Sequence, residues 1–161
     1  PFQKVVTDIT QFRYQGTNCH LVCYLDLFNS EILEWGVSKT ETMDLILPRF
    51  VVIGEKKDEY ANPYAFAQRP GSSILIRILH QPTKECGVIQ NMSRVGTPRD
   101  NAVIERIFEW FKEFLRYEYL RYSTDDSIVS VLTKAIYEFN TSRPSHKLNY
   151  ISPVQYRLQQ G

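Results

Sequence analysis

Long apolar runs are absent from this sequence: no stretch approaches the roughly eighteen uninterrupted apolar residues of a membrane-spanning helix. The first residues, PFQKVVTDITQ, also lack the apolar segment and the small-residue cleavage site of a secretory signal peptide. These two absences predict a soluble, cytoplasmic protein with no membrane partner. Because the first residue is Pro1 rather than Met, we expect a domain excised from a longer protein.

Cysteine is scarce, with only Cys19, Cys23 and Cys86, and the three are an odd number without a CxxC spacing. A disulfide framework and a structural zinc site are therefore not indicated. Cys19, His20 and Cys23 do cluster, but the surrounding residues alternate as in a strand, which would direct potential ligands to opposite faces. We favour buried strand thiols over a metal site here.

A strong charge bias is also missing. The 19 basic and 18 acidic residues leave a net charge of +1, which permits a nucleic-acid partner without arguing for one. Hydrophobic residues make up 43% of the chain and aromatic residues 13%, which excludes the disordered class. No internal repeat, low-complexity run or long linker divides the 161 residues, so a single domain spanning 1–161 is expected.

The first half of the chain reads as an antiparallel meander followed by a helix. Strands are predicted at 4–14, 20–28 and 31–37, because β-branched and alternating residues are separated there by short turn sequences. The S-x-x-E pattern from Ser38 to Glu41 resembles a capping box and predicts a helix at 41–50, which Pro48 kinks or ends. Short strands follow at 64–67 and 88–90, with a helix at 74–79 between them.

Two amphipathic helices are predicted in the second half. After Thr97 and Pro98, Asp100 or Asn101 can cap a helix with one apolar stripe: Ile104, Ile107, Phe108, Phe111, Phe114 and Leu115. A polar stripe opposes it: Glu105, Glu109, Lys112 and Arg116. Thr124 or Asp125 begins a further helix that continues to Phe139. The order of elements predicts an α/β fold with a mixed sheet and helices on its faces.

Several motifs resemble those of DDE transposases of bacterial insertion sequences, whose core is similar to that of retroviral integrases. The run at 6–10 is similar to the family's first strand, and 24–30 with Trp35 to its second and third strands. The segment NMSRVG at 91–96, followed by Asp100-Asn101-Ala102 and Glu105, closely matches the family signature S-M-S-R-x-G...D-N-A-x-x-E. The segment 137–156 resembles the family ending Y-x-x-N...R-P-H...L...T-P-x-x-Y.

This resemblance implies an RNase H-like fold with a mixed five-stranded sheet, formed by three antiparallel strands and two further strands. It also implies an Asp, Asp, Glu triad that holds two Mg²⁺ or Mn²⁺ ions for phosphodiester cleavage and strand transfer on DNA, since hard cations prefer carboxylate oxygens. Asp8 and Glu105 would be the first and third catalytic, metal-binding carboxylates. The resemblance also implies that the protein binds DNA, forms a homo-oligomer and is associated with the nucleoid.

The second carboxylate position departs from the family pattern. Counting thirty-five residues back from Glu105, over 70–104, places it at Arg69, and Gly71 and Ser72 keep the family's register. Arginine carries a permanent positive charge and offers no lone pair to a metal. The sequence therefore predicts a catalytically impaired core with low metal occupancy or none, in which Arg69 pairs with Asp8 or Glu105.

Two alternatives stay open. The chain can be an active recombinase that uses another ligand: Asp58 and Glu59 do not fit the register, and Asp26 has a counterpart in the family beside the full triad. It can also be a scaffold or interaction module that has kept only the fold.

Basic residues on and near the long helix are the candidate DNA contacts, with plain surface charge as the alternative. They are Arg94, Arg99, Arg106, Lys112 and Arg116.

Overall fold

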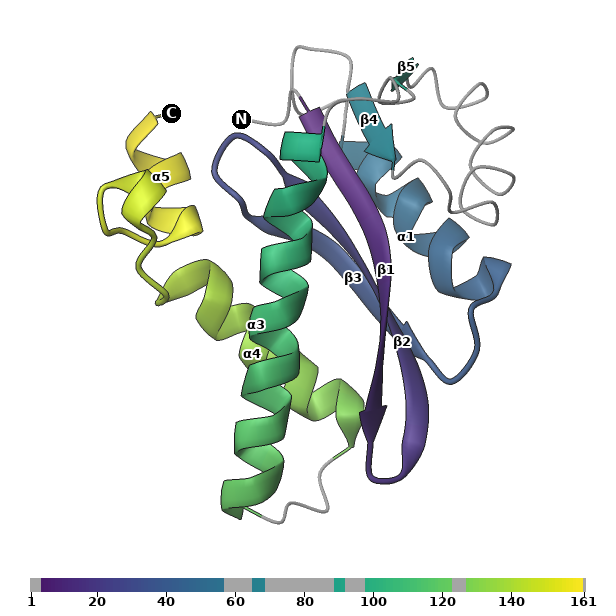
Figure 1. Ribbon diagram of the computed structural model, residues 1–161. Coiled ribbons are helices and arrows are strands. Elements are labelled where there is room, and N and C mark those ends of the chain that lie inside the picture. Colours follow the sequence, from purple (N-terminus) through teal and green to yellow (C-terminus); the bar gives the residue numbers. More distant parts are fainter. Residues whose placement is uncertain (1–3, 57–64, 69–88, 92–97, 123–126, 161) are drawn as a thin grey trace.

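The computed structural model describes residues 4–56, 65–68, 89–91, 98–122 and 127–160, with 54–56, 65–68, 89–91, 98–101 and 118–122 described by backbone alone. A mixed sheet forms its centre (Figure 1). The strands are β1 (Lys4–Tyr14), β2 (Thr17–Asp26), β3 (Ile32–Ser38), β4 (Ala65–Gln68) and β5 (Ile89–Asn91). Among the helices that the structure describes, none is long and apolar enough to cross a bilayer.

The strand order β3-β2-β1-β4-β5 confirms the predicted five-stranded mixed sheet. The first three strands pair antiparallel because short turns join them, and Gly16 takes the positive φ of 77° that the first turn requires. β4 pairs parallel to β1, and β5 parallel to β4. The last two strands lie one residue later than predicted, and β2 begins three residues earlier.

One face of the sheet is covered by α1 (Met43–Lys56). The predicted range of this helix was wrong at both ends, because Ser38 belongs to β3 and the helix continues through Pro48 to Lys56. Pro48 has no N–H for the carbonyl of Asp44 one turn earlier. The Arg49 Nη1 donates to that carbonyl at 3.3 Å and to the carbonyl of Leu45 at 2.9 Å, which explains how the helix tolerates the proline.

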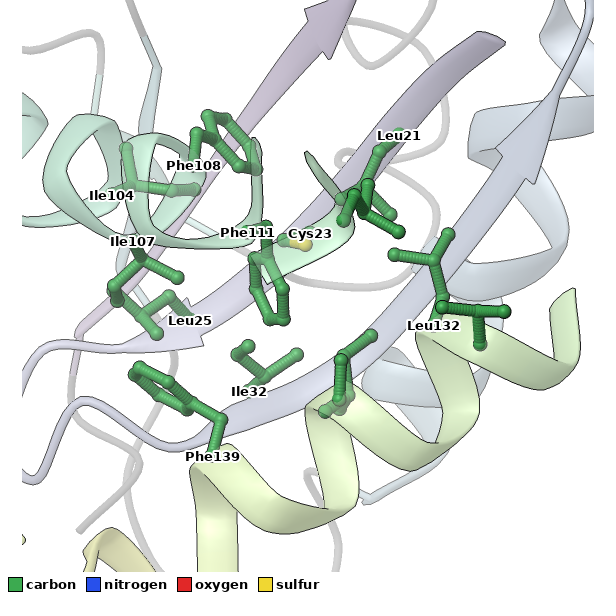
Figure 2. Close-up of a cluster of buried hydrophobic side chains, with 14 of the residues drawn as sticks. Leu21, Cys23, Leu25, Ile32, Ile104, Ile107, Phe108, Phe111, Leu132 and Phe139 are labelled. Atoms are coloured by element: carbon green, nitrogen blue, oxygen red, sulfur yellow. The ribbon is translucent and has the colours of Figure 1, made fainter. Parts of the chain in front are cut away.

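The opposite face carries α3 (Pro98–Tyr122) and α4 (Ile128–Thr141). Figure 2 shows how their apolar stripes meet side chains of β2 and β3 in one core. The buried members include Leu21, Cys23, Leu25, Ile32, Ile104, Ile107, Phe108, Phe111, Leu132 and Phe139. The predicted apolar stripes are thus confirmed, with Phe114 and Ile128 only partly buried.

The beginnings of both helices differ from the predictions. α3 starts at Pro98, where the fixed φ of proline suits a first helical position, so Asp100 and Asn101 lie inside the helix and do not precede it. α4 is capped by Ser127, whose hydroxyl accepts a hydrogen bond from the Ser130 N–H at 3.2 Å. The helix predicted at 74–79 lies outside the described residues.

Polar contacts attach the end of α4 and the C-terminal segment to the edge of the sheet. The C-terminal segment comprises the 3-10 turn η2 (His146–Leu148) and α5 (Pro153–Gln160). The side-chain amide of Asn140 accepts from the N–H of Ile32 at 3.0 Å and donates to its carbonyl at 2.9 Å, as a neighbouring strand would. Arg157 binds both carboxylate oxygens of Glu31, at 2.7 and 3.2 Å. Asn140, a residue of the family-like ending, therefore stabilises the packing of α4 against β3.

Candidate catalytic site and nucleic-acid interface

Asp8 lies on the central strand β1 and is 4% exposed. Alternation along β1 places it on the same side as Val6, which packs in the α3 and α4 core, and opposite to Val5, which packs against α1. Its Oδ1 accepts from the N–H of Ile9 at 2.9 Å. Asp8 pairs across the sheet with Cys23, whose thiol pKa is raised by burial first and by the Asp8 charge second. The carboxylate is therefore held on the α3 side of the sheet.

Glu105 is exposed on α3, between the buried residues Ile104 and Phe108. β1 and α3 run in the same direction (Figure 1). Further along, Phe12 and Lys112 line the same groove. Asp8 precedes Phe12 by about 13 Å of strand, and Glu105 precedes Lys112 by about 10 Å of helix. The two predicted carboxylates thus lie on elements that pack together, and each precedes the groove along its own element.

The remaining candidate ligands are placed less fully. Arg69, Asp58 and Glu59 lie outside the described residues. Asp26 stands on β2 in register with Val5, on the side of the sheet that faces α1. Its Oδ1 accepts from the N–H of Phe28 at 2.9 Å, so this carboxylate stabilises the turn after β2. Asp26 is therefore poorly placed to join Asp8.

The donor set does not fit the two-metal centre that the family resemblance implies. Asp8 and Glu105 supply the first and third carboxylates of the triad. By the family resemblance, the position of the second carboxylate is Arg69, which has no lone pair to offer. Within the described ranges, no group of three or more His, Cys, Asp or Glu side chains is placed to hold a metal ion. Two carboxylates with water fit at most one weakly held hard cation.

A groove of about 500 Å³ lies between the end of β1 and the middle of α3. It is lined by Phe12, Arg13, Tyr14, Gln15, Gly16, Lys112, Leu115 and Arg116. Lys112 and Arg116 fall seven and eleven residues after Glu105, so all three lie on one exposed stripe of α3. Two of the predicted DNA-contacting cations, Lys112 and Arg116, therefore border this groove. The side of α3 that carries Glu105, Lys112 and Arg116 is called the Glu105 flank below.

Arg106 lies elsewhere. One residue after Glu105, it is turned about 100° around the helix and lines a separate pocket between α3, α4 and the C-terminal turn. Three further basic residues line that pocket: Arg143, His146 and Lys147. In the sequence these three residues belong only to the family-like ending at 137–156, with no site assigned to them. Their spacing in SRPSHK was a signal, but only the fold brings them to Arg106. Arg94 and the side chain of Arg99 lie outside the description.

The cysteine and histidine cluster of β2 has a structural explanation. Cys19 and Cys23 are both buried on the α3 and α4 side, with burial as the main cause of the raised pKa of each thiol. His20 points to the other side, and its Nδ1 lies 3.9 Å from a carboxylate oxygen of Glu41.

The chain is similar to transposases and integrases both in sequence and in structure. The profile of the family described as "Integrase core domain" matches residues 86–153. InsK of insertion sequence element IS150 in Escherichia coli (strain K12) is 30% identical over 159 residues, which cover 99% of this chain and 56% of that protein. The transposase for insertion sequence element IS904 of Lactococcus lactis subsp. lactis is 25% identical over 151 residues, covering 92% of this chain and 58% of the relative.

Among solved structures, the HTLV-2 integrase catalytic core domain in complex with magnesium superposes with a TM-score of 0.74 at 15% identity, covering 97% of this chain and 96% of that one. This likeness confirms the fold. The chain spans little more than half the length of the two insertion-sequence relatives. The matched family profile, the related sequences and the shared fold lead to one conclusion: the chain is similar to insertion-sequence transposases and to integrase core domains, and it has the fold of an integrase catalytic core.

Proposed function

We propose that this domain binds DNA along the Glu105 flank of α3 and that Arg69 impairs metal-dependent strand cleavage there. The observation that carries the proposal is the arrangement of that flank. A buried carboxylate, Asp8, lies on the α3 side of the sheet, Glu105 is exposed on α3, and two cations, Lys112 and Arg116, continue the stripe of Glu105 beside a groove. Such cations position a nucleic-acid backbone through its phosphates.

The impairment follows from charge. A guanidinium about 4 Å from a divalent cation is repelled by several kcal/mol even at an effective dielectric of about 20. Arg69 in place of a carboxylate would therefore weaken Mg²⁺ or Mn²⁺ binding, while a pairing with Asp8 or Glu105 would keep the site closed. Relatives named as transposases, together with the magnesium-bound, trimeric HTLV-2 core, support DNA, a divalent metal and a homo-oligomer as the ancestral partners. A nucleoid-associated location would follow from DNA binding.

The test is the binding of a labelled DNA duplex, followed by fluorescence anisotropy at several salt concentrations. We expect the double variant Lys112→Gln/Arg116→Gln to bind roughly 10-fold more weakly and to reduce the salt slope by about 1 to 2, because each neutralised phosphate contributes about 0.9. Lys134→Gln, an exposed lysine on α4, is the matched control and should bind as the wild type does. An unchanged affinity in the double variant would contradict the proposed surface.

Cleavage assays with Mn²⁺ separate the alternatives. We expect no cleavage above background from the wild-type chain. Cleavage by the wild type that Asp8→Ala abolishes would contradict impairment and support an active recombinase with another ligand. A folded chain that binds no DNA at any salt concentration would support the scaffold alternative.

A further inference from the structure

A second pocket, next to the Glu105 flank, is lined by basic residues that have no part in the proposed function. It encloses about 350 Å³ between α3, the end of α4 and the turn before α5. We call it the cationic pocket, after four of its lining residues: Arg106, Arg143, His146 and Lys147. Its volume is near the lower end for small-molecule sites and suits one phosphate with part of its sugar.

The cationic pocket has no counter-charge in the described part of the chain. None of its lining residues is acidic, and none of its four basic side chains forms an ion pair with a described carboxylate. Glu31, beside the lining residue Ser30, is already engaged. Its Oε2 accepts from Asn29 at 2.9 Å, and both of its oxygens bind Arg157. Among the described residues, no carboxylate neutralises the positive charge of the pocket.

Arg143 is held in place before any ligand arrives. Its guanidinium carbon lies 5.2 Å from the centre of the Trp110 ring and 5.1 Å from that of Phe139. Stacking of this kind orients the planar group while leaving its N–H donors available. Partial burial lowers the pKa of Arg143, although the residue as a whole is exposed. A partly desolvated, oriented guanidinium is well prepared to bind an anion.

We propose that the cationic pocket is a second phosphate-binding site, which takes a phosphodiester of a DNA strand on the side of α3 that carries Arg106. The planar guanidinium of Arg143 can donate two parallel hydrogen bonds to phosphate oxygens. Arg106 and Lys147 add charge, and Ser145 adds a hydroxyl donor. This inference rests on the proposed DNA binding. It extends the contact surface across α3, whose full diameter with side chains is about 10 Å.

The first measurement is the salt dependence of DNA affinity for Arg106→Gln/Lys147→Gln. Both residues are exposed, so the variant is expected to fold. We expect a 3- to 10-fold loss of affinity and a salt slope smaller by about 1 to 2, with Lys134→Gln unchanged as the control. Affinity and slope equal to those of the wild type would overturn the DNA contact.

The second measurement is a titration with inorganic phosphate, followed through the arginine Nε–H signals in NMR spectra. We expect the signals of Arg106 and Arg143 to shift, while that of Arg49, whose Nε donates to the carbonyl of Trp35, stays in place. Shifts with phosphate but unchanged DNA binding in the double variant would assign the pocket to free phosphate and overturn the phosphodiester. Shifts in a chain that binds no DNA would refute the proposed DNA binding and the phosphodiester together, and would leave a site for free phosphate. No shift and no change in DNA binding would overturn the site.

Discussion

The two faces of the sheet use their polar residues in opposite ways. On the α1 face, polar side chains turn inward: the Tyr24 hydroxyl donates to the carbonyl of Ile46 at 3.0 Å, and Arg49 donates to carbonyls of α1 and, at 2.8 Å, to that of Trp35 in β3. On the α3 and α4 face, Asp8 is buried beneath the helix, and cations line hollows on both flanks of α3.

This difference shows that basic charge alone does not mark a binding surface. Arg49 and Arg116 are both helical arginines, yet the first satisfies backbone carbonyls and the second borders a groove. Partners within the fold separate a structural cation from one available to a ligand. The α1 face should therefore govern stability, and the other face ligand binding.

The largest expected effect is on stability from the α1 face. Phe50 is fully buried against the sheet, so Phe50→Ala should lower the free energy of unfolding by about 3 to 5 kcal/mol. Chemical denaturation measures the loss. At low denaturant, the folded variant should bind DNA as the wild type does. Weaker binding by the folded form would show that the two faces are not separate in function.

A matched pair of arginine variants sharpens the comparison. Arg49→Met removes the donors to three carbonyls and should cost about 1 to 3 kcal/mol of stability with unchanged DNA affinity. Arg116→Met should change stability by less than about 0.5 kcal/mol and weaken DNA binding several-fold. Each variant would be measured in both assays, and the reverse pattern would refute the distinction.

Close packing over Gly36 offers a test of the Arg49 contacts. A Cβ at Gly36 would collide with the Arg49 guanidinium, so Gly36→Ala should displace that side chain. We expect a destabilisation of about 1 to 3 kcal/mol that is not additive with that of Arg49→Met, because both changes break the same hydrogen bonds. A double-mutant cycle in urea measures this coupling. Fully additive losses would mean that Gly36→Ala destabilises the protein without breaking the Arg49 hydrogen bonds.

The smallest expected effect is a pH dependence shared by both faces. Burial raises the pKa of Tyr24 and of Cys23, so at high pH the unfolded chain binds fewer protons than the folded one, and stability falls as pH rises. The contribution is fully present below about pH 8.5 for the thiol and about pH 10 for the phenol. Tyr24→Phe should flatten the loss of stability between about pH 10 and 11. If stability fell with pH as steeply in Tyr24→Phe as in the wild type, the contribution of Tyr24 would be contradicted.

Much of the fold was predictable because hydrophobic periodicity decides which face of an element is buried. The sequence alone was enough to predict the apolar stripes through Phe111 and Phe139 and the alternation along β2. The extension of α1 past Pro48 was not predictable, since the compensating donor, Arg49, works only when it is oriented by β3. The cap at Ser127 was missed because several capping residues stand side by side at 123–127.

The candidate site was predictable only as a set of positions. Family-like motifs identified Asp8, Glu105 and the substituted Arg69. They could not show that Arg106 and Lys112 occupy different flanks of one helix, or that Arg143 meets Arg106 across more than thirty residues of chain. Such groupings depend on how α3 and α4 pack, which sequence spacing alone does not specify.

The most direct test of the central claim, that Asp8 and Glu105 form a metal site disabled by Arg69, is a Mn²⁺ titration followed by paramagnetic broadening of NMR signals. We predict that Arg69→Asp binds Mn²⁺ at least 10-fold more tightly than the wild type, equivalent to about 1.4 kcal/mol, with broadening centred on residues 8 and 105. Adding Asp8→Asn should abolish the gain. Equally tight Mn²⁺ binding at these residues in the wild-type chain would contradict the account.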